Sequence, residues 1–314
     1  MLSDEKILVT GVSGDVAYPL AKALAVDNEV WGIARFTDPA TRTRAEEAGI
    51  HTIAADLGSG ELHDVPSDVT YVLHLAYFRG GVGDFDEAIR VNGEGTGLLL
   101  QHCRRAKGAL VMSSNVIYPP HDDPWHAPRE DEPIGGMIPY WSPTSPTAKI
   151  AEESVARYCA RSLGLHTVIT RLNSAYGPDG TYLPTSNMDA VVNGRAVPAR
   201  WDPHPHAPIH LDDIVGQLEA MLDAASVPAT IVNWAGDDQV TIQQWSQYAA
   251  GYCGRAATVE VRPVPGTTRS NLADVTRRLA ITGPCAVRFE PAFRAIYEQR
   301  YGRVPTKSVS IDSP

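Results

Sequence analysis

The sequence predicts an α/β fold built on a doubly wound parallel sheet. Three observations predict it. Apolar, mostly β-branched residues at 7–9 lead into a glycine turn at 11–14 and then into a helical pattern. Short apolar runs then alternate with helical patterns as far as Ser113. The run at 70–75 is almost continuously apolar, as expected of a parallel strand that is covered on both faces.

The composition is that of a soluble globular protein. The 314 residues are 43% hydrophobic and 20% charged, enough for one large domain or two of ordinary size. No run approaches the ~18 apolar residues of a membrane span. The first residues read as a strand entry rather than a signal peptide, so we expect a cytoplasmic protein with no membrane partner. The net charge of -10 disfavours nucleic acid as a partner.

The glycine turn suits a phosphate group. Gly11 lets the chain leave the strand sharply, and Gly14 lets the backbone approach a pyrophosphate. A helix starting near Asp15 offers unpaired N–H groups and a positive dipole end. Ala17 replaces the third glycine of the usual pattern and is small enough to keep helix and strand close. For these residues alone, an ordinary strand-to-helix turn is the alternative.

The second strand is predicted at 29–34, and Arg35 follows it. In folds of this type the residue at that position faces the adenosine ribose. An acid there binds the two ribose hydroxyls of NAD, whereas an arginine pairs with the 2′-phosphate of NADP. Arg35 therefore favours NADP(H). NAD(H), with Arg35 as a surface residue at a strand end, is the alternative.

The remaining elements are predicted from periodicity and turn residues. The segment 118–146 contains eight prolines and is predicted to be a folded loop over the site. Helices are expected at 42–48, 85–106, 146–163, 212–224 and 242–253, strands at 51–55, 70–75, 109–113, 166–172, 230–234 and 258–264, irregular chain at 173–210 and a solvated tail at 305–314.

Several short motifs occur in a fixed order along the chain. They are T-G-x-x-G-x-x-A at 10–17, D-L at 56–57, H-L-A at 74–76, S-S-N-V-I-Y at 113–118, K-x-x-x-E at 149–153, R-L-N-S-A-Y-G-P at 171–178 and H-L-D-D-I at 210–214. Together they resemble the extended short-chain dehydrogenases/reductases, including the NAD-dependent epimerase/dehydratase family. The ordered set is far more specific than any one motif.

The resemblance implies a Rossmann-type domain with a smaller C-terminal substrate-binding lobe. On this basis, residues 1–173 and about 212–235 form the NAD(P)-binding domain, and 174–211 with 236–304 form the lobe. The resemblance also implies a homodimer, because family members often pair through two long helices, here 85–106 and 146–163.

The resemblance further implies where cofactor and substrate bind. Ser114 would be the catalytic hydroxyl that polarises a substrate oxygen, and Lys149 would bond the nicotinamide ribose. The implied cofactor contacts are Gly11, Ser13, Gly14, Asp15 and Val16 at the pyrophosphate, Arg35 at the ribose, Asp56 and Leu57 at the adenine, Leu75 and Ala76 flanking the dinucleotide, and Tyr77, Ser113 and Asn173 as further contacts.

One departure concerns the catalytic motif Y-x-x-x-K, where Ser145 stands four residues before Lys149. The usual tyrosine has a pKa of about 10 that the lysine and the cofactor lower, whereas a serine hydroxyl is several units less acidic. Ser145 precedes Pro146, which suits a helix N-cap, and we predict that role over proton donation.

Other groups could supply the proton. The candidates are Tyr118, Tyr140, Tyr176 and Tyr182, although packing with a satisfied hydroxyl is the simpler interpretation of each. A water molecule, Ser114 or an acidic hydroxyl of the substrate itself, as in an aromatic substrate with a phenol beside its carbonyl, are further alternatives.

A second departure concerns the substrate. Nucleotide-sugar enzymes of the family usually carry an arginine where this chain has His206, and a neutral imidazole holds a diphosphate poorly. This argues against a nucleotide sugar. His204, His206 and His210 lie close in sequence but have no recognised metal-ligand spacing, so no metal is predicted.

The leading hypothesis is therefore an NADP(H)-dependent oxidoreductase. It would be a ketoreductase that reduces a carbonyl or enone of a non-nucleotide small molecule, such as an aromatic or polycyclic compound. In it Ser114 polarises the substrate oxygen and Lys149 orients the cofactor. One alternative is a nucleotide-sugar epimerase or dehydratase with tightly held NAD. Another is a cofactor-binding regulator or pseudoenzyme without turnover.

Overall fold

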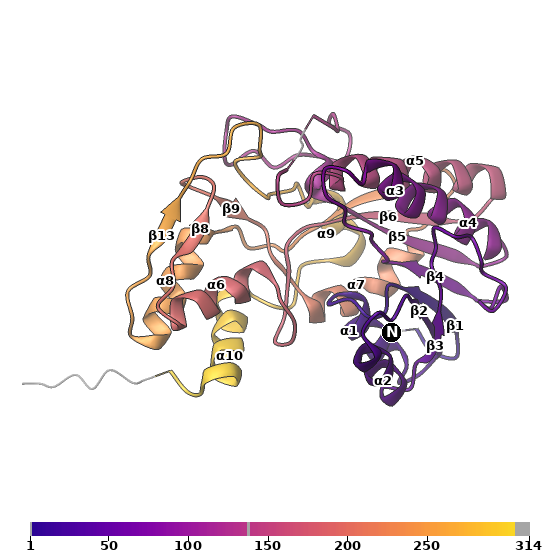
Figure 1. The fold of residues 1–314 in the computed structure, drawn as a ribbon, viewed down its shortest axis with the longest axis horizontal. Helices are drawn as coiled ribbons and strands as arrows, with labels where there is room; N and C mark the ends of the chain where they lie inside the picture. The colour runs from indigo at the N-terminus through magenta and orange to yellow at the C-terminus, as the bar shows by residue number, and fades with distance from the viewer. Residues whose placement is uncertain (1, 137–138, 305–314) are drawn as a thin grey trace, which may run out of the picture.

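A seven-stranded parallel sheet organises the protein in a computed structural model that describes residues 2–136 and 139–304 (Figure 1). Its strand order is β11-β6-β5-β4-β1-β2-β3, so the order changes direction between β1 and β4. In doubly wound sheets a ligand binds at such a point, beyond the carboxyl ends of the strands. The strands are β1 (Lys6–Thr10), β2 (Glu29–Ala34), β3 (His51–Ala54), β4 (Tyr71–His74), β5 (Gly108–Ser114), β6 (Thr167–Leu172) and β11 (Thr230–Trp234).

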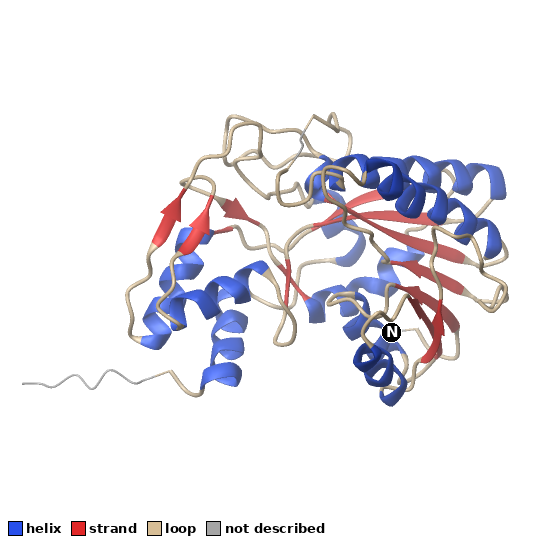
Figure 2. Ribbon diagram, in the orientation of Figure 1, coloured by secondary structure: helices blue, strands red, loops and turns tan. Residues whose placement is uncertain are grey.

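Helices cover both faces of the sheet, as Figures 1 and 2 show. Successive β1 side chains divide between the faces: Ile7 and Val9 belong to one core cluster and Leu8 to the other. The helices are α1 (Ala17–Leu24) and α7 (Leu211–Asp223) on the first face, α3 (Phe85–Ile89), α4 (Gly95–His102) and α5 (Ser145–Leu163) on the second, with α2 (Pro39–Glu47) before β3 and α9 (Thr276–Thr282) against β11. This confirms the predicted doubly wound α/β fold.

A smaller lobe is built from those segments after β6 that do not belong to the sheet or its covering helices. Helices of the lobe pack on one another through aromatic side chains such as Trp245 and Phe289, whose ring centres are 6.0 Å apart. The lobe contains α6 (Leu183–Val192), α8 (Ile242–Cys253) and α10 (Phe289–Tyr301), and the strand pairs β7 (Ala175–Tyr176) with β10 (Ile209–His210), β8 (Val197–Ala199) with β13 (Val259–Val261), and β9 (Pro205–His206) with β12 (Val240–Thr241).

Some elements differ from the sequence-based expectation. The segment 173–210 is not irregular throughout, because it contains α6 and four short strands. The helix expected at 85–106 ends at His102 and is interrupted by a π-helical turn, Arg90–Glu94. Helices α9 and α10 were not predicted. The expected tail at 305–314 lies outside the described residues. Within the described chain, no helix is both long and apolar enough to cross a membrane.

Candidate active site

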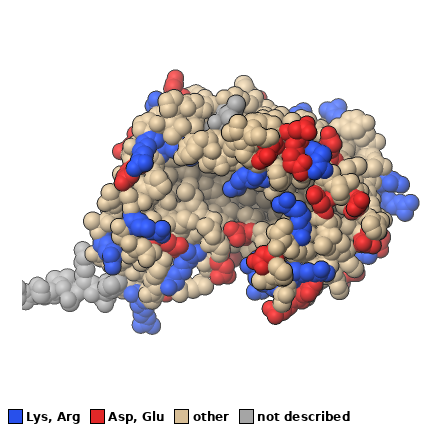
Figure 3. Space-filling model, viewed as in Figure 1, with Lys and Arg blue, Asp and Glu red and all other residues tan. Residues whose placement is uncertain are grey.

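A cavity of about 960 Å³ opens at the carboxyl ends of β1, β2, β4 and β5. Both the sheet and the lobe line it, the lobe through segments near residues 173, 181, 200 and 269. The space-filling view shows the hollow, with basic side chains at its edge (Figure 3). A cavity of this size and position suits a cofactor and a substrate together.

The turn after β1 allows close backbone contact. Gly11 has φ +71°, and a Cβ there would lie 2.7 Å from the Cα of Ala76. Thr10 Oγ1 accepts hydrogen bonds from the N–H groups of Leu75, at 3.0 Å, and Ala76, at 2.9 Å, which joins the ends of β1 and β4. No described side chain caps α1 after Val16. The Tyr18 N–H donates to the Gly14 carbonyl at 3.0 Å and Pro19 has no N–H, so in the first turn of α1 the Ala17 N–H is left for a phosphate. The turn fits the pyrophosphate of a dinucleotide.

The wall beside β2 and β3 contains the residues predicted for the adenosine half. Arg35 is exposed, and its guanidinium lies 5.9 Å from the ring centre of Phe78. Asp56 and Leu57 line the same cavity, and an Asp56 oxygen accepts a hydrogen bond from the N–H of Gly58 at 2.9 Å. Arg35, directly after β2, is thus at the edge of the cavity where the adenosine ribose was predicted to bind.

The lobe reaches the glycine turn through the loop before α6. The Tyr182 hydroxyl donates a hydrogen bond to the carbonyl of Asp15 at 2.6 Å, and the Thr181 N–H lies 3.3 Å from an Asp15 carboxylate oxygen. Burial raises the pKa of Tyr182. Tyr182 thus connects the lobe to the glycine turn, and this contact occupies its hydroxyl.

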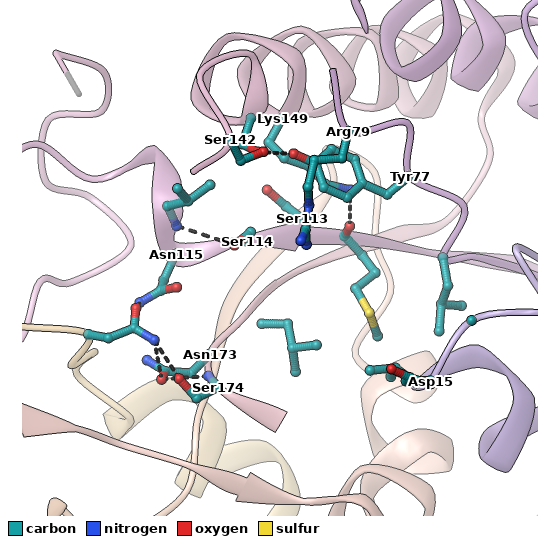
Figure 4. Close-up of a pocket in the computed structure, with 18 of the residues that line it drawn as sticks. Asp15, Tyr77, Arg79, Ser113, Ser114, Asn115, Ser142, Lys149, Asn173 and Ser174 are labelled. Atoms are coloured by element: carbon teal, nitrogen blue, oxygen red, sulfur yellow. Dashed lines mark hydrogen bonds between the residues drawn. The ribbon is translucent and has the colours of Figure 1, made fainter. Parts of the chain in front are cut away.

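Lys149 lies in α5 with a buried ammonium group. Its Nζ is 4.6 Å from the ring centre of Tyr77 (Figure 4). It also donates a hydrogen bond to the carbonyl of Met112 at 2.8 Å and lies 2.6 Å from Glu152 Oε2. Burial raises the pKa of Glu152 to about 7, and Lys149 opposes that shift. Burial and Lys149 together lower the pKa of nearby His74 to about 3, so this imidazole is neutral.

Ser114 ends β5 and faces the cavity with its neighbour Ser113. Ser114 Oγ accepts a hydrogen bond from the Val116 N–H at 3.3 Å, which leaves its own O–H available to a substrate oxygen. Ser113 Oγ is buried and has no hydrogen-bond partner among the described residues. Both hydroxyls are therefore placed to serve a ligand.

Tyr118 and Tyr176 are buried in structural contacts. The Tyr118 hydroxyl donates to Asn233 at 2.7 Å and accepts from Arg171 at 2.8 Å, and burial raises the pKa of Tyr118 to about 12. Tyr176 packs against His210 with ring centres 5.0 Å apart, and burial raises its pKa as well. A raised pKa opposes proton release, so these environments disfavour an acid–base role.

Ser145 is the first residue of α5, and Thr144 precedes it as the N-cap. The Ser145 Oγ hydrogen-bonds with Ser142 Oγ and with the Tyr77 hydroxyl (Figure 4). The predicted N-cap role is therefore wrong. The Ser-Pro pair did indicate the start of the helix, but a tertiary contact from the end of β4 engages the hydroxyl.

The segment after β4 is fixed by Asn92 from the π-helical turn. The Asn92 side chain accepts a hydrogen bond from the Phe78 N–H at 2.8 Å and donates to the Phe78 carbonyl at 2.9 Å. Arg79 places its guanidinium 5.6 Å from the ring centre of Tyr77. From the sequence, Tyr77 was predicted only as a cofactor contact. Its position directly after H-L-A was the available signal that it could also contact the substrate.

A network of amides forms another part of the lining. Asn271 Nδ2 donates to Ser174 Oγ at 2.7 Å and to Asn173 Oδ1 at 3.2 Å, and Asn115 hydrogen-bonds with the Asn271 oxygen (Figure 4). The Asn173 Nδ2 is buried without a hydrogen-bond partner among the described residues. Asn173 is thus an available donor, as a predicted ligand contact should be.

Two arginines that were not predicted line the lobe side. The Arg200 guanidinium lies 3.9 Å from the ring centre of Trp141, and that of Arg269 lies 5.0 Å from Trp201. Arg200 Nε is buried without a hydrogen-bond partner among the described residues. Both belong to segments without a recognisable motif, so only the folded chain reveals them.

The loop histidines are buried and neutral. Burial lowers the pKa of His204 to about 3 and that of His206 well below 6.5. His206 Nδ1 lies 3.0 Å from Ser174 Oγ. Within the described chain, no group of three or more side chains is arranged to hold a metal ion. His206 thus adds no charge to the cavity, but Arg200 and Arg269 supply the cations whose apparent lack argued against a diphosphate.

Comparisons with known proteins place these features in context. A model of the NAD dependent epimerase/dehydratase family matches residues 7–197. Among solved structures, UDP-glucuronic acid 4-epimerase from Bacillus cereus, in complex with UDP-glucuronic acid and NAD, is similar with a TM-score of 0.78 and 22% identity over 94% of this chain and 100% of that chain. MoeE5 in complex with UDP-glucose and NAD has a TM-score of 0.78 and 23% identity, over 94% and 98%.

A third similar structure is UDP-N-acetylglucosamine 4-epimerase from Methanobrevibacter ruminantium M1, with a TM-score of 0.78 and 21% identity over 95% of this chain and 98% of that chain. No curated protein matches the chain by sequence. At these identities the structural similarities establish the fold.

Proposed function

The chain belongs to the NAD-dependent epimerase/dehydratase family, and from that membership we propose that it is an NAD-dependent enzyme acting redox-neutrally on a nucleotide sugar. This was the alternative in the sequence-based ranking, where an NADP(H)-dependent reductase stood first. The similar solved structures bind NAD and UDP-sugars, which supports the alternative over the reductase.

The observation that carries this proposal is the pair of arginines at the lobe side of the cavity. Arg200 lies beside Trp141, an indole ring that also lines the cavity, and Arg269 lies beside Trp201. A diphosphate requires cations, and a nucleobase stacks on aromatic or guanidinium planes. The buried Arg200 Nε has no hydrogen-bond partner among the described residues, and a phosphate oxygen would accept its N–H.

In the proposed function, different residues of the chain would bind the cofactor and the substrate. The glycine turn at Gly11 and the start of α1 would hold the pyrophosphate, and Lys149 would orient the nicotinamide half. When bound, the dinucleotide supplies the acceptor and donor of hydride. Ser114 would bind the reacting oxygen of the substrate, and Asn173 would donate a further hydrogen bond. The protein thus contributes position and electrostatics.

The test is turnover of UDP-glucuronic acid and UDP-glucose by the purified protein with NAD, followed by proton NMR of the sugar. Arg269→Ala should lower kcat/KM by about 10–100-fold, the loss of a charged hydrogen bond, mainly through KM. Arg262→Ala, a control with a side chain 81% exposed, should leave turnover unchanged. Absence of turnover with both UDP-sugars would overturn the proposed substrate.

The NADP(H)-dependent reductase remains a second candidate because of Arg35, the cation directly after β2. Arg35→Ala should weaken NADPH binding about tenfold by removing a charged partner of the 2′-phosphate, and should leave NADH affinity unchanged. Fluorescence titration measures both, with Arg104→Ala as a surface control. Equal loss of both affinities would contradict this assignment, and a strong wild-type preference for NADPH would move the reductase ahead.

A further inference from the structure

Tyr77 supplies a hydroxyl at the place where the motif tyrosine is missing. Ser145 stands one helical turn before Lys149, and its Oγ hydrogen-bonds with the Tyr77 hydroxyl, which arrives from the end of β4 (Figure 4). We propose that Tyr77 is the acid–base catalyst of this enzyme, in place of the tyrosine replaced by Ser145. The inference rests on the proposed function, because it presupposes oxidation or reduction at a substrate C–O carbon.

Two cations lie close to the Tyr77 ring. Lys149 Nζ is 4.6 Å from the ring centre, and the Arg79 guanidinium is 5.6 Å from it. Positive charge nearby stabilises the negative charge that develops on the oxygen as a proton leaves. Lys149 is buried, where a low local dielectric strengthens this effect. The lysine of the motif is thus beside a tyrosine after all.

The other tyrosines of the cavity are engaged elsewhere. Tyr77, Tyr118 and Tyr182 line it among the described residues. The Tyr118 hydroxyl is held by an amide and a guanidinium, and the Tyr182 hydroxyl donates to a backbone carbonyl. The Tyr77 hydroxyl hydrogen-bonds with Ser145, and Ser145 hydrogen-bonds with Ser142. Each serine hydroxyl can donate or accept a hydrogen bond. Tyr77 therefore has partners that permit exchange of its proton.

In the proposed step, Tyr77 accepts a proton from the substrate during oxidation and returns it during reduction. In the oxidation, the substrate C–H bond breaks, and its hydrogen leaves with both electrons as hydride to the dinucleotide. The substrate O–H bond breaks, its electrons form the C=O bond, and the proton moves to the ionised oxygen of Tyr77. In the reduction, the Tyr77 hydroxyl returns that proton to the oxygen as hydride returns to carbon. Ser114 holds the substrate oxygen throughout, and no further reactant is consumed.

The first test is Tyr77→Phe, which keeps the ring and removes only the hydroxyl. NAD-loaded protein is mixed with UDP-glucuronic acid, and nicotinamide absorbance reports the oxidation in a single turnover. The rate should fall at least about 100-fold, while NAD affinity by calorimetry stays within about twofold. Tyr158→Phe, on the same helix as Lys149 and 70% exposed, should match wild type. A Tyr77→Phe rate equal to wild type would overturn the proposal.

A second readout does not depend on the sugar. At alkaline pH, NAD binding brings a positive nicotinamide ring to the site, and should generate ultraviolet absorbance of tyrosinate in wild type and Tyr158→Phe. Tyr77→Phe should lose that signal. A signal that persists in Tyr77→Phe, or is absent from wild type, would overturn the assignment of Tyr77. Failure of wild type to act on UDP-sugars, with the signal intact, would instead overturn the proposed substrate alone.

Discussion

Replacing Lys149 with alanine is expected to lower turnover by about 100–1,000-fold and to destabilise the fold by about 3–5 kcal/mol above neutral pH. The turnover loss follows from removing the cation that lies next to the Tyr77 ring and that, on the proposed function, would orient the nicotinamide half of the cofactor. The stability loss follows from leaving Glu152 as a buried carboxyl, because its partner Nζ at 2.6 Å is gone.

The free energy of unfolding depends on pH through the Glu152 carboxyl. Burial raises the pKa of Glu152 from 4.5 to about 7 even though Lys149 lowers it, so the pKa should rise further in Lys149→Ala. Above pH 4.5 the unfolded chain releases a proton that the folded protein still holds. The free energy of unfolding therefore falls as pH rises from 4.5 through the folded pKa, and stability is greatest on the acid side.

Urea denaturation at acidic and alkaline pH measures the stability effect, and steady-state kinetics measures the turnover. The matched control is the double variant Lys149→Met with Glu152→Gln, which removes both charges of the pair. It should regain stability and lose the pH dependence but remain inactive, which separates the structural role of Lys149 from its role at the site. Wild-type kinetics in Lys149→Ala would refute the latter.

Arg171→Ala is expected to destabilise the protein by about 3–5 kcal/mol, because it leaves a buried carboxylate unpaired. Arg171 on β6 makes two hydrogen bonds to Glu153 on α5, at 3.0 and 2.9 Å, and others to the Tyr118 hydroxyl at 2.8 Å and the Glu130 carbonyl at 3.1 Å. It therefore anchors the helix that contains Lys149 to the sheet.

The control for Arg171 is Arg42→Ala, which breaks an exposed ion pair of the same 2.9 Å length with Glu46. Exposed pairs contribute about 0.2–1 kcal/mol, so the two variants should differ several-fold in the free energy of unfolding measured with urea. An Arg171→Ala loss as small as that of Arg42→Ala would contradict the expectation that Glu153 is left as a buried, unpaired carboxylate.

Elements with a strong local pattern were predictable from the sequence. The strand at 29–34, the strand at 230–234 and the helix at 242–253 have the predicted bounds, because apolar periodicity and turn residues mark their ends. Strands β7 to β10 were not predicted, since each has only two or three residues and is defined by its partner. The π-helical turn was also missed, because it depends on tertiary contacts rather than on propensity.

The predictable part of the site is the part that backbone geometry demands. Gly11 adopts a positive φ against Ala76, and a glycine at that place can be read from one sequence. The contact between Tyr77 and Ser145 joins residues 68 positions apart, and nothing local to either indicates the other. The same holds for Arg200 and Arg269, which both line the cavity only because the lobe folds over it.

The hydrogen bonds on either side of Tyr77 bear on the cost of catalysis. The backbone before it is fixed by Thr10 through the Ala76 N–H, at 2.9 Å, and the backbone after it by Asn92 through both polar groups of Phe78. Its main chain therefore has little conformational entropy left to lose when the hydroxyl meets a reacting oxygen. The entropy lost on reaching the transition state is therefore made smaller by two side chains that are not among the residues lining the cavity, a form of preorganisation at the end of one strand.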